Sequence, residues 1–319
     1  MPVISSSACA KLILLGEHAV VYGEPALAVP FLGLRVRCVV EPWINGPSGM
    51  IQISARDLQI NQTLQALPED NFLRKAIELV LAELKVSRTP TCKLGIYSEI
   101  PFSAGLGASA AIAVAIMRAL SAFLGHPLER ETFNRLAYET EKLMHGNPSG
   151  IDNTVIVYEQ PVLFRKNEPI VFVHPGSTLH FLIADSGIKK ATAETVAYLA
   201  QQRERDPESV DTTLAEIGKI ALLGKKAFEL GDLAALGEAM NANQSLLAHL
   251  DLSCEALDEL IAAARQAGAL GAKLTGGGKG GNIIALVTPI SQENVKEALL
   301  SAGALSVYHT SLKGMAAND

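Results

Sequence analysis

Hydrophobic positions along the chain recur with two different periods, and these predict both strands and helices. Residues 34–41 (LRVRCVVE) alternate between apolar and polar positions, which is typical of a half-exposed strand. Residues 71–85 instead carry apolar side chains at helical spacing. Further strand-length apolar runs are 3–8, 12–15, 26–29, 50–54, 91–98, 161–164, 170–173, 179–185, 271–274, 283–287 and 305–311. Further helices are predicted at 108–124, 128–144, 190–204, 211–230, 232–248, 254–267 and 291–302.

Turn residues suggest how some of these elements begin, end and pair. A Gly/Pro/Ser turn at 45–49 predicts that 50–54 returns as the strand paired with 34–41. Gly231 is predicted to end one helix as its C-terminal cap, and Ser291 to begin the last helix.

Strands and helices follow one another without strict alternation, and this order predicts an α+β fold. The length of 319 residues is sufficient for about two domains. The short strands around 160–178 indicate the boundary, so we expect an N-terminal domain at 1–165 and a C-terminal domain at 166–319.

Composition narrows the function classes. Hydrophobic residues make up 49% of the chain and charged residues 19%, which is enough for a sizeable core. The net charge of −6 argues against a nucleic-acid partner, because phosphate contacts need a basic face. A local basic pocket for one small anion remains compatible with this charge.

Nothing in the sequence indicates secretion or a membrane span. The first residues lack a basic segment before an apolar run. The most apolar stretch, 108–124, is interrupted by Arg118 and is shorter than the roughly 20 residues that a span requires. The four cysteines form no Cys-x-x-Cys pair and are expected to be reduced and mostly buried, as in an intracellular protein. We therefore expect a cytoplasmic protein without a membrane partner.

The stretch 101–111 (PFSAGLGASAA) has the arrangement of a phosphate-binding loop. It follows a predicted strand and leads into a predicted helix, whose first N–H groups lack internal partners and attract anions. Gly105 and Gly107 allow the backbone to approach an anion closely. The loop lacks the Gly-Lys-Ser/Thr ending of a P-loop and the third glycine of the dinucleotide fingerprint. Taken alone, it is at least as compatible with an ordinary strand-to-helix turn.

Two carboxylates lie where a cation or a substrate could use them. Glu141 falls in the last turn of its predicted helix, where the helix dipole disfavours a negative charge unless a cation offsets it. Asp152 follows the turn Asn147-Pro148-Ser149-Gly150, which can place a carboxylate in a cleft. The alternatives are a solvated glutamate beside Lys142 and an aspartate that caps the next helix.

A second glycine-rich loop, Thr275–Gly281, joins two apolar strands. Such a run is costly to order and is expected where backbone passes close to a ligand, and Lys279 within it could meet a phosphate. Near the N-terminus, Lys11 lies between two apolar runs and Glu17-His18 follow directly. A lone lysine there is more often a snorkelling surface residue, and a lone histidine is more often structural.

Taken together, these motifs resemble the GHMP kinases, the superfamily of galactokinase, homoserine kinase, mevalonate kinase and phosphomevalonate kinase. Within it, the mevalonate kinases are the most similar. Residues 11–23 (KLILLGEHAVVYG) resemble their first motif, 101–111 the second, and 273 onward (KLTGGGKGGN) the third. The segment 145–153 (HGNPSGIDN) resembles the one that carries the catalytic aspartate. The resemblance spans nearly the whole chain.

The resemblance implies a role for each matching residue. Asp152 and Lys11 would be catalytic, Ser109 and Glu141 would hold Mg²⁺, and Glu17 and His18 would contact mevalonate. A looser match implies that Lys190 and Thr192 also contact this substrate. The ATP phosphates would be wrapped by the loop residues Pro101, Ser103, Ala104, Gly105, Leu106, Gly107, Ala108 and Ser109.

The resemblance also implies a fold and partners. The N-terminal domain would resemble domain 2 of ribosomal protein S5, and the C-terminal domain would be ferredoxin-like. The enzyme would phosphorylate the 5-hydroxyl of mevalonate with ATP and Mg²⁺, and a homodimer is possible by family analogy. Alternatives are a related kinase for another hydroxylated metabolite, and a ligand sensor of the same fold that has lost catalysis.

The chain departs from the family pattern in three places. Ala8-Cys9-Ala10-Lys11 replaces the common Ala-Pro-Gly-Lys, Ala108 stands where serine is common, and Lys279 interrupts the glycines of the third loop. None of these departures removes a proposed catalytic group, but they bear on nucleotide affinity and substrate preference.

Overall fold

The computed structural model describes residues 2–102, 105–146, 148–190 and 192–314. Their contacts divide the chain into two compact units. Unit 1 takes the described residues of 1–10, 34–102 and 107–159, and unit 2 those of 11–33, 103–106 and 160–319. Strands β1 (Ile4–Leu15) and β2 (Ala26–Pro42) have residues in both units, so no single cut separates them. The division into 1–165 and 166–319 stays a prediction.

Each of the first two strands is longer than the sequence pattern predicted. The runs 3–8 and 12–15 are one strand, β1, and the runs 26–29 and 34–41 are one strand, β2. Residues 8–15 of β1 are all buried. A strand buried on both faces shows no alternation of apolar and polar residues. For this reason the sequence pattern did not show that the two apolar runs on either side of Lys11 form one strand.

Unit 1 contains most of a sheet in which β5 (Cys92–Ser98) separates β2 from β3 (Ile51–Ala55). Val36 of β2 lies opposite Ser98 of β5 in an antiparallel pair, whereas β3 runs parallel to β5. The predicted pairing of 50–54 with 34–41 is therefore wrong. A parallel pair needs a crossover connection, and helix α1 (Phe72–Glu83) lies in the connection from β3 to β5.

The other strands of this sheet are short. Strand β4 (Ile60–Thr63) forms the edge beside β3. Strand β6 (Val162–Phe164) pairs with residues 26–28 of β2, and β7 (Val171–Phe172) pairs with β6. The described residues also form short 3-10 helices, namely η1 (Ala19–Tyr22), η2 (Arg56–Leu58) and η3 (Leu64–Ala66).

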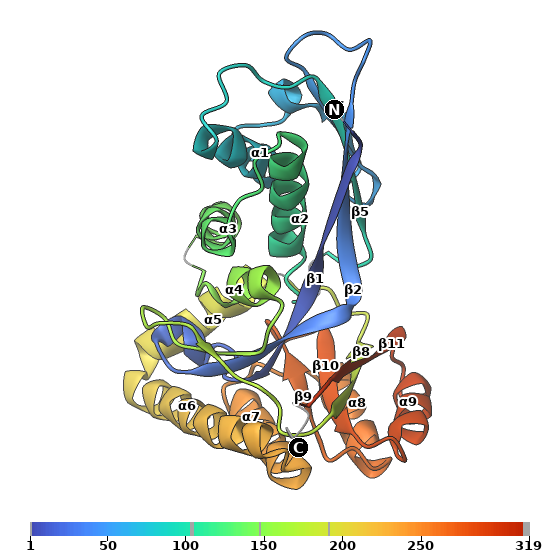
Figure 1. The fold of residues 1–319 in the computed structure, drawn as a ribbon. Helices are drawn as coiled ribbons and strands as arrows, with labels where there is room; N and C mark the ends of the chain where they lie inside the picture. The colour runs from blue at the N-terminus through green and yellow to red at the C-terminus, as the bar shows by residue number, and fades with distance from the viewer. Residues whose placement is uncertain (1, 103–104, 147, 191, 315–319) are drawn as a thin grey trace. The chain divides into compact units, whose positions relative to one another are not determined.

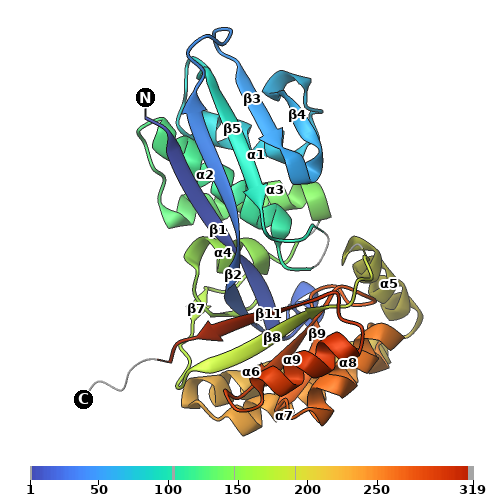
Figure 2. The same cartoon turned by 90° about the vertical axis from the view of Figure 1, so that its right-hand side faces the viewer.

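In unit 1, helices α1, α2 (Ala108–Phe123) and α3 (Arg130–His145) lie on one face of the sheet, as Figures 1 and 2 show. Helix α4 (Ile151–Tyr158) packs against α2 and α3. Every residue of α2 is buried except Arg118 and Ala122. Its many alanines allow the neighbouring helices to approach closely, and the helix therefore forms the centre of this unit.

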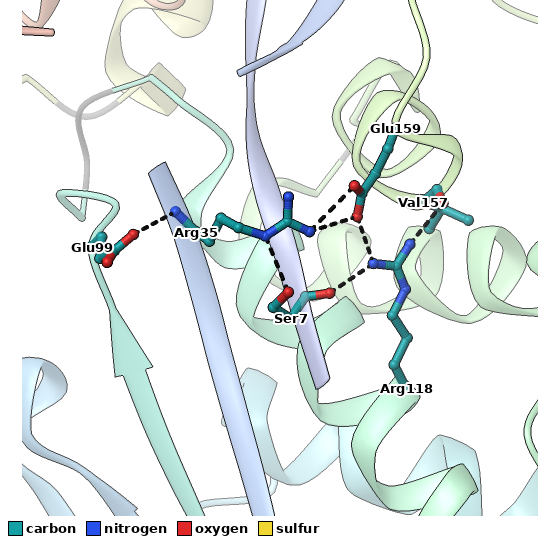
Figure 3. Close-up of polar contacts among 6 residues, drawn as sticks. All are labelled: Ser7, Arg35, Glu99, Arg118, Val157 and Glu159. Atoms are coloured by element: carbon teal, nitrogen blue, oxygen red, sulfur yellow. Dashed lines mark hydrogen bonds and ion pairs between the residues drawn. The ribbon is translucent and has the colours of Figure 1, made fainter. Parts of the chain in front are cut away.

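Arg118 joins α2 to strand β1 and to the end of α4 (Figure 3). Its Nη1 donates to the Ser7 carbonyl oxygen at 2.7 Å and to Glu159 Oε1 at 2.8 Å, while its Nη2 donates to the Val157 carbonyl oxygen at 2.8 Å. Arg35 of β2 also reaches Glu159, with Nη2 at 3.0 Å from Oε1. This network fixes the C-terminal end of α4, the helix that carries Asp152.

We expect Arg118→Met to lower the free energy of unfolding by about 1.5–3 kcal/mol, because the charge-assisted bonds that hold α4 are lost. The matched control is Arg135→Met, since Arg135 pairs with Glu83 at 2.7 Å but is 57% exposed. Exposed ion pairs contribute about 0–1 kcal/mol. Urea unfolding of both variants measures the difference, and equal losses would contradict a special role for Arg118.

Unit 2 contains a four-stranded antiparallel sheet with the order β11-β8-β10-β9. The strands are β8 (Leu179–Asp185), β9 (Gly271–Thr275), β10 (Asn282–Val287) and β11 (Ser306–Leu312). In chain order they follow the pattern strand, helices, strand, strand, helix, strand, which is the ferredoxin-like arrangement. The predicted ferredoxin-like C-terminal fold is therefore confirmed.

The predicted helices of this unit are confirmed as α5 (Thr192–Arg205), α6 (Pro207–Leu230), α7 (Leu233–His249), α8 (Glu255–Gln266) and α9 (Gln292–Ser301). Helix α6 begins at Pro207, earlier than predicted, because Asp206 caps it and proline suits the first helical position. Gly231 ends α6 with φ of 69°, as predicted. Ser291 occupies the cap of α9 but makes no cap bond, since its hydroxyl pairs with Thr288.

The sheet of unit 2 is buried on both faces. Leu182 and Ala184 of β8 belong to the same hydrophobic core as residues of α8 and α9. Helix α9 packs on β8 and β11, and α8 packs on β9 and β10 (Figure 2). Residues that alternate with them point to the opposite face, where Phe181, Ile183 and Lys273 are also fully buried.

None of the helices in the described part of the chain is long and apolar enough to cross a membrane. All four cysteines are free, and Cys9, Cys38 and Cys92 are buried, as the sequence predicted.

Candidate active site

The first motif continues from β1 into a tight turn in which Gly16 and His18 both have positive φ angles. Gly16 has φ of 97°, and a Cβ atom there would lie 2.5 Å from the Cα atom of Ala26. Its N–H donates to Oδ1 of Asn243 at 3.0 Å. His18 has φ of 61°, which is uncommon for a residue with a side chain and is typically retained where function needs it.

The third motif lies against this turn, within unit 2. The Nε2 atom of His18 is 2.9 Å from the carbonyl oxygen of Gly277. Thr275 Oγ1 accepts from the N–H of Ile13 at 3.2 Å and donates to the Ile13 carbonyl oxygen at 3.1 Å. Two motifs that lie more than 250 residues apart are therefore fastened together at both His18 and Thr275.

Part of the second motif reaches the same place. The backbone N–H of Lys11 donates to the carbonyl oxygen of Leu106 at 3.1 Å. A Cβ atom at Gly276 would lie 2.9 Å from the Gly105 carbonyl oxygen. The glycines here permit close contact of two loops. The predicted approach of this backbone to a ligand stays a prediction. Ser103 and Ala104 lie outside the described residues.

The His18 ring is buried and uncharged near neutral pH. Burial lowers its pKa to about 4, and the hydrogen bond to the Gly277 carbonyl opposes this only in part. A neutral imidazole that donates from Nε2 has a lone pair on Nδ1. In this tautomer, Nδ1 of His18 is a hydrogen-bond acceptor.

The other predicted substrate residues differ in burial. Thr192 is the first residue of α5, and a Cβ atom at Gly277 would lie 2.9 Å from its Oγ1 atom. Thr192 thus lies against the third loop. Lys190 is partly exposed and forms an ion pair with Glu194.

The predicted catalytic residue Lys11 is only 3% exposed, so it is not a snorkelling surface residue. It lies within β1 rather than between two strands.

Lys279, the departure in the third loop, is held by neighbouring side chains. Its Nζ atom lies 2.7 Å from Asp251 Oδ2 and 4.3 Å from the centre of the Tyr198 ring. Asp251 follows α7, and Tyr198 belongs to α5. Lys279 therefore ties the glycine-rich loop to α5 and to the turn after α7, a role that its isolated sequence position did not suggest.

In unit 1, the start of α2 brings a hydroxyl to a buried carboxylate. Gly107, with φ of 76°, precedes Ala108 and Ser109. Ser109 Oγ donates to Glu141 Oε1 at 2.8 Å, and both residues are buried. His145 Nε2 lies 3.5 Å from Glu141 Oε2. Helix α3 continues to His145, so Glu141 does not lie in the last turn as predicted, and the dipole argument for a bound cation weakens.

The oxygen atoms of Ser109 and Glu141 form the donor set that suits magnesium. Mg²⁺ prefers hard oxygen ligands and usually takes one or two carboxylates, with water and phosphate completing its shell. Among the described residues there is no group of three or more His, Cys, Asp or Glu side chains that would hold a metal ion. Ser109 and Glu141 thus supply two oxygen ligands of the kind that Mg²⁺ accepts.

Asp152 is the second residue of α4, behind Gly150, which has φ of 95°. It is therefore not the helix cap that sequence left as an alternative. A carboxylate in the first turn is favoured by the positive end of the helix dipole. Asn153 Nδ2 donates to Asn134 Oδ1 at 2.6 Å, and this bond ties the start of α4 to α3.

A cavity of about 190 Å³ adjoins Pro101, and sequence reasoning missed it. It lies in unit 1, at the edge where the parallel strands β3 and β5 both end. Ser98 N–H donates to Asp57 Oδ2 at 3.1 Å in its wall. The lining residues are Ala55, Asp57, Leu58, Ile96, Ser98, Glu99, Ile100, Pro101, Phe102 and Ile112. No signal in the sequence marks Asp57, because the cavity depends on the parallel pairing.

Known protein families match both parts of the chain. The model for the GHMP kinases N terminal domain matches residues 71–160, and the model for the GHMP kinases C terminal matches residues 225–305. The glycine-rich loop before α2 and the ferredoxin-like sheet agree with these matches. The chain belongs to the GHMP kinase family.

Two mevalonate kinases are similar to this chain over nearly its whole length. That of Thermococcus gammatolerans is 38% identical and covers 94% of this chain and 93% of the relative. That of Pyrococcus horikoshii is 37% identical and covers 95% of this chain and 93% of the relative. Within the GHMP kinases, the chain therefore belongs with the mevalonate kinases.

Solved structures agree with this placement. The L. major mevalonate kinase in complex with R-mevalonate has a TM-score of 0.82 at 29% identity and covers 98% of this chain and 97% of that one. The Methanococcus jannaschii mevalonate kinase has a TM-score of 0.83 at 26% identity and covers 99% and 98%. The predicted fold and family are confirmed.

Proposed function

We propose that this chain transfers the terminal phosphoryl group of ATP to the 5-hydroxyl of mevalonate and forms 5-phosphomevalonate for isoprenoid biosynthesis. One observation carries the proposal: the first and third motifs and Gly105–Leu106 meet around the His18 turn. The full-length similarity to mevalonate kinases supports the choice of substrate.

On the acceptor side, we assign His18, Thr192 and Lys190 to mevalonate, a hydroxylated carboxylic acid. The neutral His18 ring offers Nδ1 to a hydroxyl, and Thr192 presents its hydroxyl beside the same loop. Lys190 supplies a positive charge that complements a carboxylate. The resemblance also implies a contact from Glu17, which is paired with Lys273.

On the nucleotide side, the N–H groups at the start of α2 bind phosphate together with the glycine-rich loop. The loop residues are Pro101, Ser103, Ala104, Gly105, Leu106, Gly107, Ala108 and Ser109. The cavity beside Pro101 is partly apolar and is suited to the planar base of ATP. Ser109 and Glu141 would hold Mg²⁺, which neutralises charge on the triphosphate when bound.

For the chemistry, we assign Asp152 and Lys11. Asp152 either accepts the proton of the substrate hydroxyl or only orients that hydroxyl while the proton leaves after transfer. The Lys11 ammonium stabilises the charge that spreads over the transferring phosphoryl group. A homodimer and a cytoplasmic location stay predictions.

Acceptor-dependent ADP release from Mg-ATP tests the proposal, with mevalonate compared against homoserine, galactose and 5-phosphomevalonate. We expect turnover with mevalonate alone and a 5-phosphate product in the phosphorus NMR spectrum. Turnover only with another acceptor would keep the kinase assignment and overturn the substrate. ATP binding without turnover on any acceptor would overturn catalysis and favour a ligand sensor.

A further inference from the structure

Glu17 belongs to a buried ion pair whose partner lies in the third motif. Its Oε1 atom accepts from Nζ of Lys273, and both side chains are 0% exposed. Both residues belong to unit 2. The sequence pointed to Glu17 as a substrate contact and gave no role to Lys273.

The position of Lys273 in β9 explains why the two charges meet. Ala272 and Leu274 belong to the hydrophobic core shared with α8 and α9, so the alternating residue Lys273 points to the opposite face of the sheet. Its Nζ also donates to the carbonyl oxygen of Leu274. Two residues further along the chain comes Thr275, which is hydrogen-bonded to Ile13 of β1. Lys273 therefore connects strand β9 to the turn that follows β1.

The burial of this pair is not explained by stability. Burial raises the pKa of Glu17 and lowers the pKa of Lys273, and the attraction between the two charges opposes both shifts. Removing two charges from water costs about as much as their attraction returns, so such pairs are weak evidence of stabilisation. In some proteins, a buried ionic group is retained because it specifies one geometry.

The Glu17–Lys273 pair fixes the geometry of the turn at His18. Glu17 precedes His18, whose backbone has φ of 61° and whose ring contacts the Gly277 carbonyl. Gly16, on the other side, is held by Asn243. The turn is thus fixed by one partner from α7 and by two from the segment Lys273–Gly277. Loss of any anchor would allow the unfavourable backbone of His18 to relax.

We propose that Lys273 and Glu17 are positioning residues, which hold His18 in the orientation that receives the acceptor substrate, and that Glu17 does not itself touch that substrate. This proposal rests on the proposed function only for the identity of the acceptor. It assigns a role to Lys273 and a different role to Glu17.

The test compares Glu17→Gln, Lys273→Met and the double variant, each assayed by mevalonate binding in calorimetry and by the KM values for mevalonate and ATP. Each single variant leaves one buried charge without its partner, so we expect mevalonate binding to weaken about 10-fold or more while the KM for ATP changes less than about 3-fold. The double variant removes both charges, and we expect it to bind mevalonate within about 3-fold of the unmodified protein. The matched control is Lys225→Met with Glu229→Gln, an ion pair on α6 at 2.7 Å that is partly exposed.

Each other result would overturn the proposal. Equal weakening in Glu17→Gln and in the double variant would mean that Glu17 contacts the substrate directly. Single variants with a lower unfolding temperature but unchanged mevalonate binding would reduce the pair to a structural role. If neither single variant folds, the double variant decides, since folding without mevalonate binding also contradicts the proposal.

Failure of the proposed function would look different. The unmodified protein would then neither bind nor phosphorylate mevalonate, and one of the other acceptors would be turned over instead. Binding of that acceptor would then be measured in the same variants. We expect it to weaken in each single variant and to return in the double variant.

Discussion

Asp152→Asn is expected to lower kcat by about 100- to 10,000-fold, the range that a positioned proton-transfer group contributes. The amide keeps the size and shape of the carboxylate but cannot accept the hydroxyl proton. Asp152 lies in the first turn of α4, so loss of its charge also removes a favourable dipole interaction of about 0.3–1 kcal/mol. The expected loss of activity far exceeds this effect on stability, and ATP binding should persist.

Single-turnover kinetics measures the loss in the chemical step, and calorimetric titration with ATP measures the affinity for ATP. Glu208→Gln is the matched control, because Glu208 is an exposed carboxylate in the first turn of α6. That variant should lose comparable helix stability and keep its kcat. Near-normal turnover by Asp152→Asn would remove this residue from the mechanism.

Glu141→Gln is expected to produce the second large loss, a fall of about 100- to 1,000-fold in kcat/KM for Mg-ATP. The buried carboxylate accepts from Ser109 and lies 3.5 Å from the His145 ring. Glutamine keeps the volume but removes the charge that would balance a divalent cation. The midpoint of the Mg²⁺ activation curve should therefore rise.

Binding of Mn²⁺ in the presence of a non-hydrolysable ATP analogue gives a readout that does not depend on turnover. Glu139→Gln is the matched control on the same helix, since Glu139 is 41% exposed and pairs with Lys142. It should change neither Mn²⁺ binding nor kcat. Unaltered Mn²⁺ affinity in Glu141→Gln would show that Glu141 does not hold the metal.

The elements of this fold were largely readable from the sequence. The helical periods at 71–85 and 211–230 lie at the positions of α1 and α6, and the apolar runs of unit 2 coincide with β8, β9, β10 and β11. The period of the apolar residues shows which side of a helix or strand faces the core. Every half-buried helix or strand has one such side, so its period can be recognised without knowing its partners. The positions where glycines are needed were also visible, because few other residues tolerate such backbones.

Strand pairing was not readable. Strand β5 separates β2 from β3, although 34–41 and 50–54 are close in sequence and joined by a turn. The parallel pair of β3 and β5 depends on the crossover through α1, and no local pattern records it. The cavity beside Asp57 and Pro101 follows from that pairing, and therefore it was missed as well.

The sequence by itself determined the α+β class, the glycine-rich loops and, through its motifs, the GHMP kinase family. These depend on residue types and short spacings. Only the tertiary structure decided that Glu17 pairs with Lys273, that Ser109 meets Glu141 and that Lys279 turns to Asp251. Such partners are chosen by which strands and helices pack together. For the fully buried Glu17 in particular, the counter-charge comes from a side chain that lies far along the chain.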